Sequence, residues 1–202
     1  MDEGHPDVGG QTSDQDLVRQ TLAGEQRAFE VLVHRYQRLV FRVIHGVAPG
    51  AEVEDIAQEV FLRAYRSLGQ VRDDSRLGPW LIRIAVNLCY DYLRRLRRRQ
   101  ERSFSELSER EGMVLERLMS DETALAQIDR LALRELAERL VGQLAPQDRA
   151  VLLLKEREGM ETREIARTLG CSETAVRLRL FRARRALRKV FGKTVDWPGR
   201  KT

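Results

Sequence analysis

This sequence predicts an all-α fold, built as two small helical domains that an acidic linker joins. Leu, Ala, Arg and Glu dominate and form helices readily, while aromatic residues make up only 6% of the 202-residue chain. Apolar residues recur at helical spacing in several stretches. We expect a disordered tail over residues 1–13, domains over 14–99 and 128–191, a flexible linker over 100–127 and a C-terminal tail over 192–202.

The first domain is predicted from three long runs with the helical period, which a short helix near residues 16–23 precedes. The first run covers residues 29–44 and the second covers 56–68. Gly69 is expected to end the second helix in the left-handed conformation that glycine adopts easily. The third run starts at Pro79, a residue suited to the first turn of a helix, and continues into a cluster of arginines.

The second domain is predicted to end in a helix-turn-helix. Pro146 opens one helix, and two more follow over residues 161–169 and 173–191. Gly170 can adopt the positive φ that a tight turn needs, and Ser172 is a good N-cap for the last helix. Val176 and Leu180 of the last helix should face the core. The side chains expected to project outward, as in helices that enter the DNA major groove, are Arg177, Phe181, Arg182 and Arg185.

Charge is distributed so as to favour a polyanionic partner. The net charge is +5 and the isoelectric point is near 9.6. Six arginines lie within residues 94–102, and seven basic residues with no acid lie within 176–190. Residues 103–129 carry seven carboxylates against two arginines. A solvated helix face would carry basic and acidic residues in mixture. The separation of basic from acidic segments therefore indicates a nucleic-acid partner.

Several classes of protein are excluded by what the sequence lacks. It contains no apolar run of membrane-spanning length and no secretory signal, so we expect a cytoplasmic protein without membrane insertion. The only cysteines, Cys89 and Cys171, fit a reducing compartment and are interpreted as small core residues. No His or Cys spacing suits a metal, so we expect neither a cofactor nor an enzyme.

Two further segments have compositions that suit an interface. The helix from Trp80 to Arg99 combines aromatic and amide side chains with arginines, a mixture that suits single-stranded or melting DNA. Its aromatics could equally be core residues and its arginines merely solubilising. Residues 52–63 place a polar strip opposite an apolar face, and such a strip is most often only a solvated surface.

Taken together, three segments resemble a known family. They are EDIAQEVFLRAYRSL, WLIRIAVNLCYDYLRR and a helix-turn-helix that ends in SETAVRLRLFRARRAL. In this order they resemble the group IV, or extracytoplasmic-function (ECF), sigma factors of bacterial RNA polymerase, over roughly residues 15–190. The resemblance implies a sigma-two domain followed by a sigma-four domain. It also implies initiation of transcription at promoters of a signal-responsive regulon.

The resemblance, with the residue chemistry above, assigns three groups of site residues. Those expected to bind the clamp coiled coil of the polymerase β′ subunit are Asp55, Gln58, Glu59 and Phe61. Those expected to contact the minus-ten element are Trp80, Asn87, Asp91, Arg94 and Arg95. Those expected to contact the minus-thirty-five duplex are Arg177, Arg179, Phe181, Arg182 and Arg185.

The resemblance also implies further contacts and partners, and the sequence differs from the family pattern at one position. Residues 70–78 correspond to the loop that captures a flipped base, and the acidic linker to the segment that threads toward the RNA exit channel. The expected partners are core polymerase, including its β subunit, promoter DNA and an anti-sigma factor. Leu178 stands where many relatives carry a small polar residue, which leaves the base preference at that contact open.

Two other functions remain open from the sequence. The chain could be a helix-turn-helix regulator that binds duplex operators alone, as a dimer on a palindrome. It could also be an adaptor that binds RNA polymerase without contacting DNA. The helix from Trp80 to Arg99 discriminates among them, because a protein that binds only duplex DNA has no use for it.

Overall fold

The computed structural model describes residues 12–71, 77–103 and 141–191, and these ranges contain helices and no strand. The prediction of an all-α fold is confirmed. The predicted N-terminal tail lies outside these ranges up to residue 11, as do most of the predicted linker and all of residues 192–202. The predicted domain boundaries therefore stay predictions. No described helix is both long enough and apolar enough to cross a membrane.

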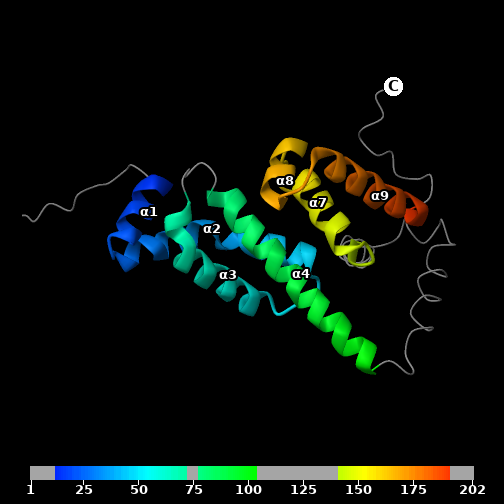
Figure 1. The fold of residues 1–202 in the computed structure, drawn as a ribbon, viewed down its shortest axis with the longest axis horizontal. Helices are drawn as coiled ribbons and strands as arrows, with labels where there is room; N and C mark the ends of the chain where they lie inside the picture. Colours follow the sequence, from blue (N-terminus) through cyan, green and yellow to red (C-terminus); the bar gives the residue numbers. More distant parts are fainter. Residues whose placement is uncertain (1–11, 72–76, 104–140, 192–202) are drawn as a thin grey trace, which may run out of the picture.

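The first half of the described fold begins with three helices (Figure 1). They are α1 (Asp14–Leu22), α2 (Gln26–Val47) and α3 (Val53–Ser67). Helix α1 begins at Asp14 because the Ser13 side chain accepts a hydrogen bond from the backbone N–H of Asp16, at 3.1 Å. Along α2 the buried residues Leu32, Val40, Val43 and Ile44 keep the predicted spacing, and α2 packs against both α1 and α3.

The prediction that Gly69 ends α3 in a left-handed conformation is wrong. Positive φ angles occur at Gly24, Gly50, Gly159 and Gly170, and Gly69 is not among them. The chain instead tightens into a 3-10 turn, η1 (Leu68–Gln70), directly after α3. Leu68 explains this, because its buried side chain holds the turn against the core.

Helix α4 (Leu77–Ser103) crosses the molecule, and its C-terminal part projects beyond the other helices (Figure 1). Pro79 lies in its first turn, where a missing backbone N–H costs nothing. The helix begins two residues before the predicted start, so part of the predicted loop is helical. It also continues past residue 99, where the first domain was expected to end.

The second half consists of α7 (Pro146–Glu156), α8 (Thr162–Leu169) and α9 (Glu173–Phe191). Helices α8 and α9 form the predicted helix-turn-helix. Gly170 ends α8 with φ 65° and ψ 41°, in the left-handed region, and the Ser172 hydroxyl caps α9 by accepting from the N–H of Ala175 at 3.1 Å. Val176 and Leu180 are buried as expected.

Gly170→Ala is expected to lower the free energy of unfolding by about 1–2 kcal/mol, because an L residue is strained in the left-handed region. The new Cβ would also lie 3.4 Å from the Arg83 guanidinium. Gly69→Ala is the control, since that site has no positive φ and its Cβ would only touch Leu22. Urea denaturation measures both variants, and equal effects would contradict the conformational argument.

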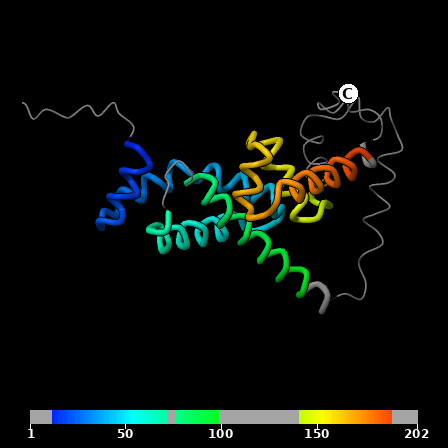
Figure 2. Tube along the Cα trace, turned by 45° about the horizontal axis from the view of Figure 1, so that its top comes forward, coloured from blue at the N-terminus to red at the C-terminus, as the bar shows by residue number. Residues whose placement is uncertain are grey.

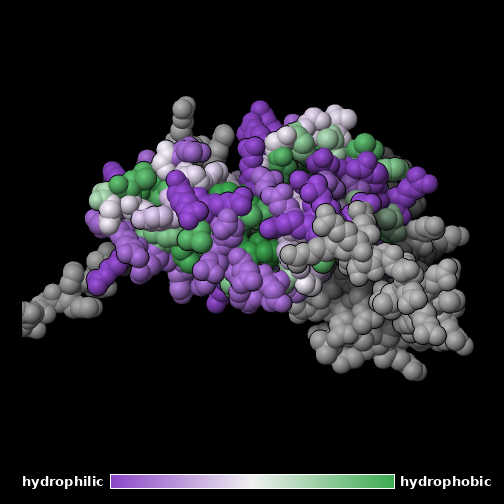
Figure 3. Space-filling model, turned by 60° about the horizontal axis from the view of Figure 1, so that its bottom comes forward, coloured by the Kyte–Doolittle hydropathy of each residue, from purple (hydrophilic) through white to green (hydrophobic). Residues whose placement is uncertain are grey.

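The two halves share one apolar core, in which α2 packs against α7 and α4 against α8. Figure 2 shows the course of the chain through these helices. Arg149 of α7 is 5% exposed and donates to the carbonyl oxygen of Val47 at the end of α2, at 3.0 Å. Arg42 of α2 makes two hydrogen bonds to Glu158, at 2.9 and 3.1 Å. The face of the described residues seen in Figure 3 is mainly hydrophilic with apolar patches between, in keeping with the 33% content of charged residues.

Candidate nucleic-acid and partner interfaces

The predicted polymerase-binding strip lies along one side of α3. Asp55 and Gln58 are exposed, and Glu59 is half-exposed and bonded to Arg63 one turn later, at 2.7 Å. Phe61 differs from this group, because it is partly buried and packs against the core. The acidic side chains at the start of α3 also complement the positive end of the helix dipole.

Sequence reasoning missed the apolar end of this strip. Leu62 is 42% exposed and lies one turn beyond Gln58, and Tyr65 is 50% exposed although its spacing placed it on the buried face. The Tyr65 ring stands edge-on to Phe29, with 5.0 Å between the ring centroids. The exposure of Leu62 could have been found from its position, seven residues after Asp55 on the same helical stripe.

Helix α4 presents the predicted minus-ten residues on its outer side. Asn87 is exposed and has no hydrogen-bond partner within the described residues, while Trp80 is half-buried against the core. Asp91 forms an ion pair with Arg94 at 3.4 Å, and its backbone carbonyl accepts from Nε of Arg95 at 3.3 Å. Ile82, Ala85 and Cys89 are buried on the opposite side, which fixes the orientation of this helix face.

Arg83 belongs to the same stripe but was not predicted. It is exposed and lies between Trp80 and Asn87 at helical spacing. Its guanidinium also lies close to Gly170 in the turn of the helix-turn-helix. Arg83 therefore brings a cation of α4 next to the second half of the molecule, and its spacing alone was the signal that could have identified it.

Two titratable side chains of α4, Cys89 and Tyr90, are removed from solvent near the second half of the molecule. Burial raises the pKa of Cys89 and of Tyr90 to about 12, so both side chains are protonated at neutral pH. The Cys89 thiol lies in the core, as interpreted from the sequence. The Tyr90 hydroxyl is buried and has no hydrogen-bond partner within the described part of the chain.

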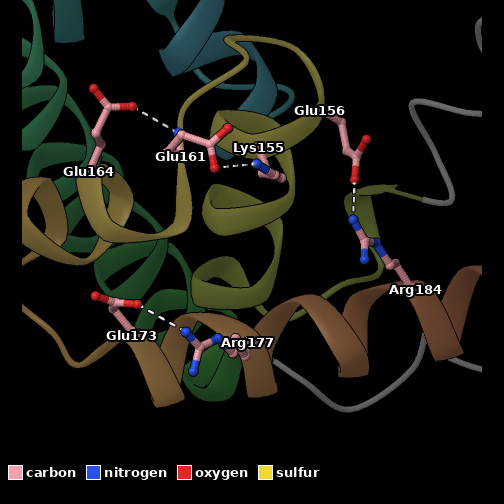
Figure 4. Close-up of polar contacts among 7 residues, drawn as sticks. All are labelled: Lys155, Glu156, Glu161, Glu164, Glu173, Arg177 and Arg184. Carbon is pink, nitrogen blue, oxygen red and sulfur yellow. Dashed lines mark hydrogen bonds and ion pairs between the residues drawn. The ribbon is translucent and has the colours of Figure 1, made fainter. Parts of the chain in front are cut away.

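Three of the predicted minus-thirty-five residues line a groove of about 500 Å³ beside α9, namely Arg177, Phe181 and Arg185. Its other lining residues are Lys155 of α7, Thr162 of α8, and Leu180, Arg184 and Arg188 of α9. Arg177 is held by Glu173, the first residue of α9, at 3.0 Å, and Lys155 pairs with Glu161 at 3.3 Å (Figure 4). The groove thus combines exposed cations with an apolar lining.

The other two predicted minus-thirty-five residues have neighbours of their own inside the fold. Arg182 makes two hydrogen bonds to Asp148 of α7, at 2.7 and 3.0 Å, and these bonds raise its pKa. Arg179 lies near the sulfur of Cys171, at 3.6 Å. The sequence could not separate these two arginines from the groove residues, because Asp148 is 34 residues away from Arg182.

Family models match both halves of the chain, in the order expected from the sequence. The model of Sigma-70 region 2 matches residues 32–99, which include α3 and most of α4. The model of Sigma-70 region 4 matches residues 134–187, which include α7, α8 and most of α9. Each candidate surface therefore falls within a matched region.

Whole-chain comparisons agree with these matches. The chain is 36% identical to the ECF RNA polymerase sigma-E factor of Escherichia coli (strain K12), over 88% of this chain and 93% of that protein. It is also 36% identical to the RNA polymerase sigma-H factor of Pseudomonas aeruginosa (strain PAO1), over 89% of this chain and 94% of that protein.

Solved structures show the same fold. CnrH, solved in complex with the cytosolic domain of CnrY, matches with a TM-score of 0.61 and 27% identity, over 91% of this chain and all of that one. The sigma factor RpoE of Bartonella quintana matches with a TM-score of 0.62 at 19% identity, over 83% of this chain and 98% of that one, which shows the fold alone. Because its relatives match it nearly from end to end and both sigma regions occur in order, the chain belongs to the extracytoplasmic-function sigma factors and is an alternative sigma factor.

Proposed function

We propose that this sigma factor binds core RNA polymerase through α3 and promoter DNA through α4 and α9. The observation that carries the proposal is the separation of surface chemistry within the two matched regions. An acidic strip with an apolar end lies on α3, while cations gather on the outer sides of α4 and α9. Such a division suits one protein surface and two nucleic-acid surfaces.

The α3 surface is proposed to dock on the clamp coiled coil of the β′ subunit. Asp55 and Gln58 would supply charge and hydrogen-bond complementarity, and Leu62 would supply an apolar contact at the end of the strip. This combination matches the usual anatomy of protein interfaces, where a few apolar anchors are surrounded by polar groups. Phe61 would support the strip from the core rather than reach the partner.

The α4 surface is proposed to hold the melted minus-ten element. Asn87 has an amide that can donate to and accept from an exposed base edge, and the arginines that follow can contact the backbone phosphates. On α9 the groove residues Arg177, Phe181 and Arg185 are proposed to meet the minus-thirty-five duplex in the major groove. We propose that the protein acts in the cytoplasm and catalyses no reaction of its own.

An anti-sigma factor is proposed as the regulator of this chain. CnrH, which shares its fold and 27% of its aligned residues, was solved with the cytosolic domain of CnrY bound. The exposed strip of α3 and the groove of α9 would both be available to such a partner. Occupying either surface would block the corresponding step of initiation.

Run-off transcription with purified core polymerase tests the proposed function. The full chain is expected to support initiation from promoters chosen by the holoenzyme out of a randomised duplex library. Binding to core without any transcript would support the adaptor function instead. Specific binding to a duplex operator in the absence of core would support the helix-turn-helix regulator.

Asn87→Ala is expected to reduce transcription from duplex promoters about tenfold, the factor that corresponds to one lost hydrogen-bonding interaction of about 1.4 kcal/mol. A template that is already melted across the minus-ten region should partly rescue this variant, because unpairing and unstacking a base costs a few kcal/mol. Permanganate footprinting measures opening of the bubble.

Arg94→Ala is the comparison for this prediction. It should lose affinity in a salt-dependent way on both templates, because a phosphate contact is independent of melting. The melting temperature of Asn87→Ala should stay unchanged, since the side chain is exposed. Complete promoter opening by this variant would remove Asn87 from the mechanism.

A further inference from the structure

Helix α9 exposes two large apolar side chains at the same place on its surface. Leu178 is 52% exposed and Phe181 is 61% exposed, and the three-residue spacing makes them neighbours on one helix face. By contrast, Val176, Leu180, Ala183 and Leu187 of α9 are buried in the core. A single exposed leucine needs no explanation. Two exposed apolar side chains next to each other, beside the basic groove of α9, do need one.

The surroundings of this pair define the partner that could cover it. Arg177, Arg182 and Arg185 are exposed neighbours on α9, and Lys155 lies across the groove. Glu173, at the start of α9, is the only carboxylate of that helix, and it is paired with Arg177 (Figure 4). Asp148 of α7 holds Arg182, so basic side chains still outnumber the carboxylates around the apolar pair. A fitting partner is therefore apolar at its centre and anionic at its periphery.

A thymine in the major groove has this chemistry. Its 5-methyl group stands on the groove floor, and phosphates line both edges of the groove. The position of α9 as second helix of a helix-turn-helix would place its exposed face in that groove. An acidic amphipathic helix fits less well, because it would need a longer row of apolar contacts at helical spacing than two side chains provide.

We propose that Leu178 determines base specificity by packing against the 5-methyl group of a thymine in the upstream promoter element, beside Phe181. This inference rests on the proposed contact between α9 and that element. Leucine has no donor or acceptor for the edges of guanine, adenine or cytosine, so placing it there would leave their polar groups without partners. The small polar residue expected at this position in relatives would lack this preference.

Replacing thymine with uracil tests the proposal most directly, because it removes the methyl group and keeps every hydrogen-bonding group. Holoenzyme formed with the full chain is assayed on its selected promoter, with each thymine of the upstream element replaced in turn. At one position we expect initiation to fall about fourfold at subsaturating holoenzyme, the factor that burial of one methyl group provides. Leu178→Ala should abolish this difference at the same position.

Two more variants complete the design. Leu178→Ser should relax the thymine preference when upstream elements are selected again from a randomised library. Leu22→Ser is the matched control, because Leu22 is 58% exposed on α1, and it should keep the uracil effect unchanged. All three variants should melt at the temperature of the parent, since each replaced side chain is exposed.

The possible failures are distinguishable. If no uracil substitution weakens the parent, or if the uracil effect persists in Leu178→Ala, the inference about Leu178 is overturned while upstream recognition stands. If initiation by the parent does not change when the whole upstream element is altered, the proposed role of α9 is wrong as well.

Discussion

Arg149→Met should lower the free energy of unfolding by about 3 kcal/mol. The guanidinium donates to the carbonyl oxygens of Val47, Gly142 and Leu144 at 2.8–3.0 Å, and methionine would leave them without these donors. An unpaired buried acceptor costs about 1–3 kcal/mol. Part of this loss is offset because a buried cation, whose pKa burial lowers, is removed as well.

Urea denaturation measures the effect, and Arg157→Met is the matched control. Arg157 follows α7 directly and is exposed, so its replacement should change stability by less than about 0.5 kcal/mol. Arg149→Lys should also be destabilising, because one ammonium lacks the planar fork that reaches carbonyls on both sides. A loss below about 1 kcal/mol in Arg149→Met would show that water replaces the guanidinium.

Asp55→Lys is expected to weaken association with core polymerase by about 2 kcal/mol or more, because reversal places like charges in a complementary interface. Leu62→Ala is expected to weaken it by about 1–2 kcal/mol without any change of charge, as for an apolar interface anchor. Both side chains are exposed, so helicity and melting temperature should match those of the parent. Equilibrium titration of labelled protein with core polymerase measures both losses.

Glu30→Lys controls for the change in net charge, because Glu30 is exposed on α2 and lies outside the strip. It should bind core as the parent does. If Asp55→Lys and Leu62→Ala also bind as the parent does, the polymerase-binding surface lies elsewhere on the molecule. If only the charge reversal has an effect, the apolar end of the strip is not part of the interface.

The helices and the helix-turn-helix were predictable because their causes are local. The spacing of Leu32, Val40 and Val43 depends only on the helical period, and Gly170 and Ser172 fix the turn through their own conformational and hydrogen-bonding preferences. Gly69 shows the limit of such rules. The burial of Leu68, a tertiary effect, decided how α3 ends.

The candidate surfaces were predictable in part. Charge and spacing placed Asp55, Asn87 and Arg177 on exposed helix faces. They could not identify which exposed residues also have partners, because a partner such as Asp148 comes from another helix. Leu62 and Arg83 are a different case. Their helical spacing was visible in the sequence and was sufficient to identify them, so no tertiary information was needed.

By itself the sequence determined the all-α class, the order of the helices, the two basic surfaces and the membership of the sigma-factor family. Tertiary structure alone decided that both halves share a core, that Arg149 joins α7 to the end of α2, and that Arg182 pairs with Asp148. The physical reason is the distance along the chain over which each interaction acts. Periodicity, capping and charge act within a few residues, whereas the contact of Arg149 with Val47 spans 102 residues and exists only after the chain has packed.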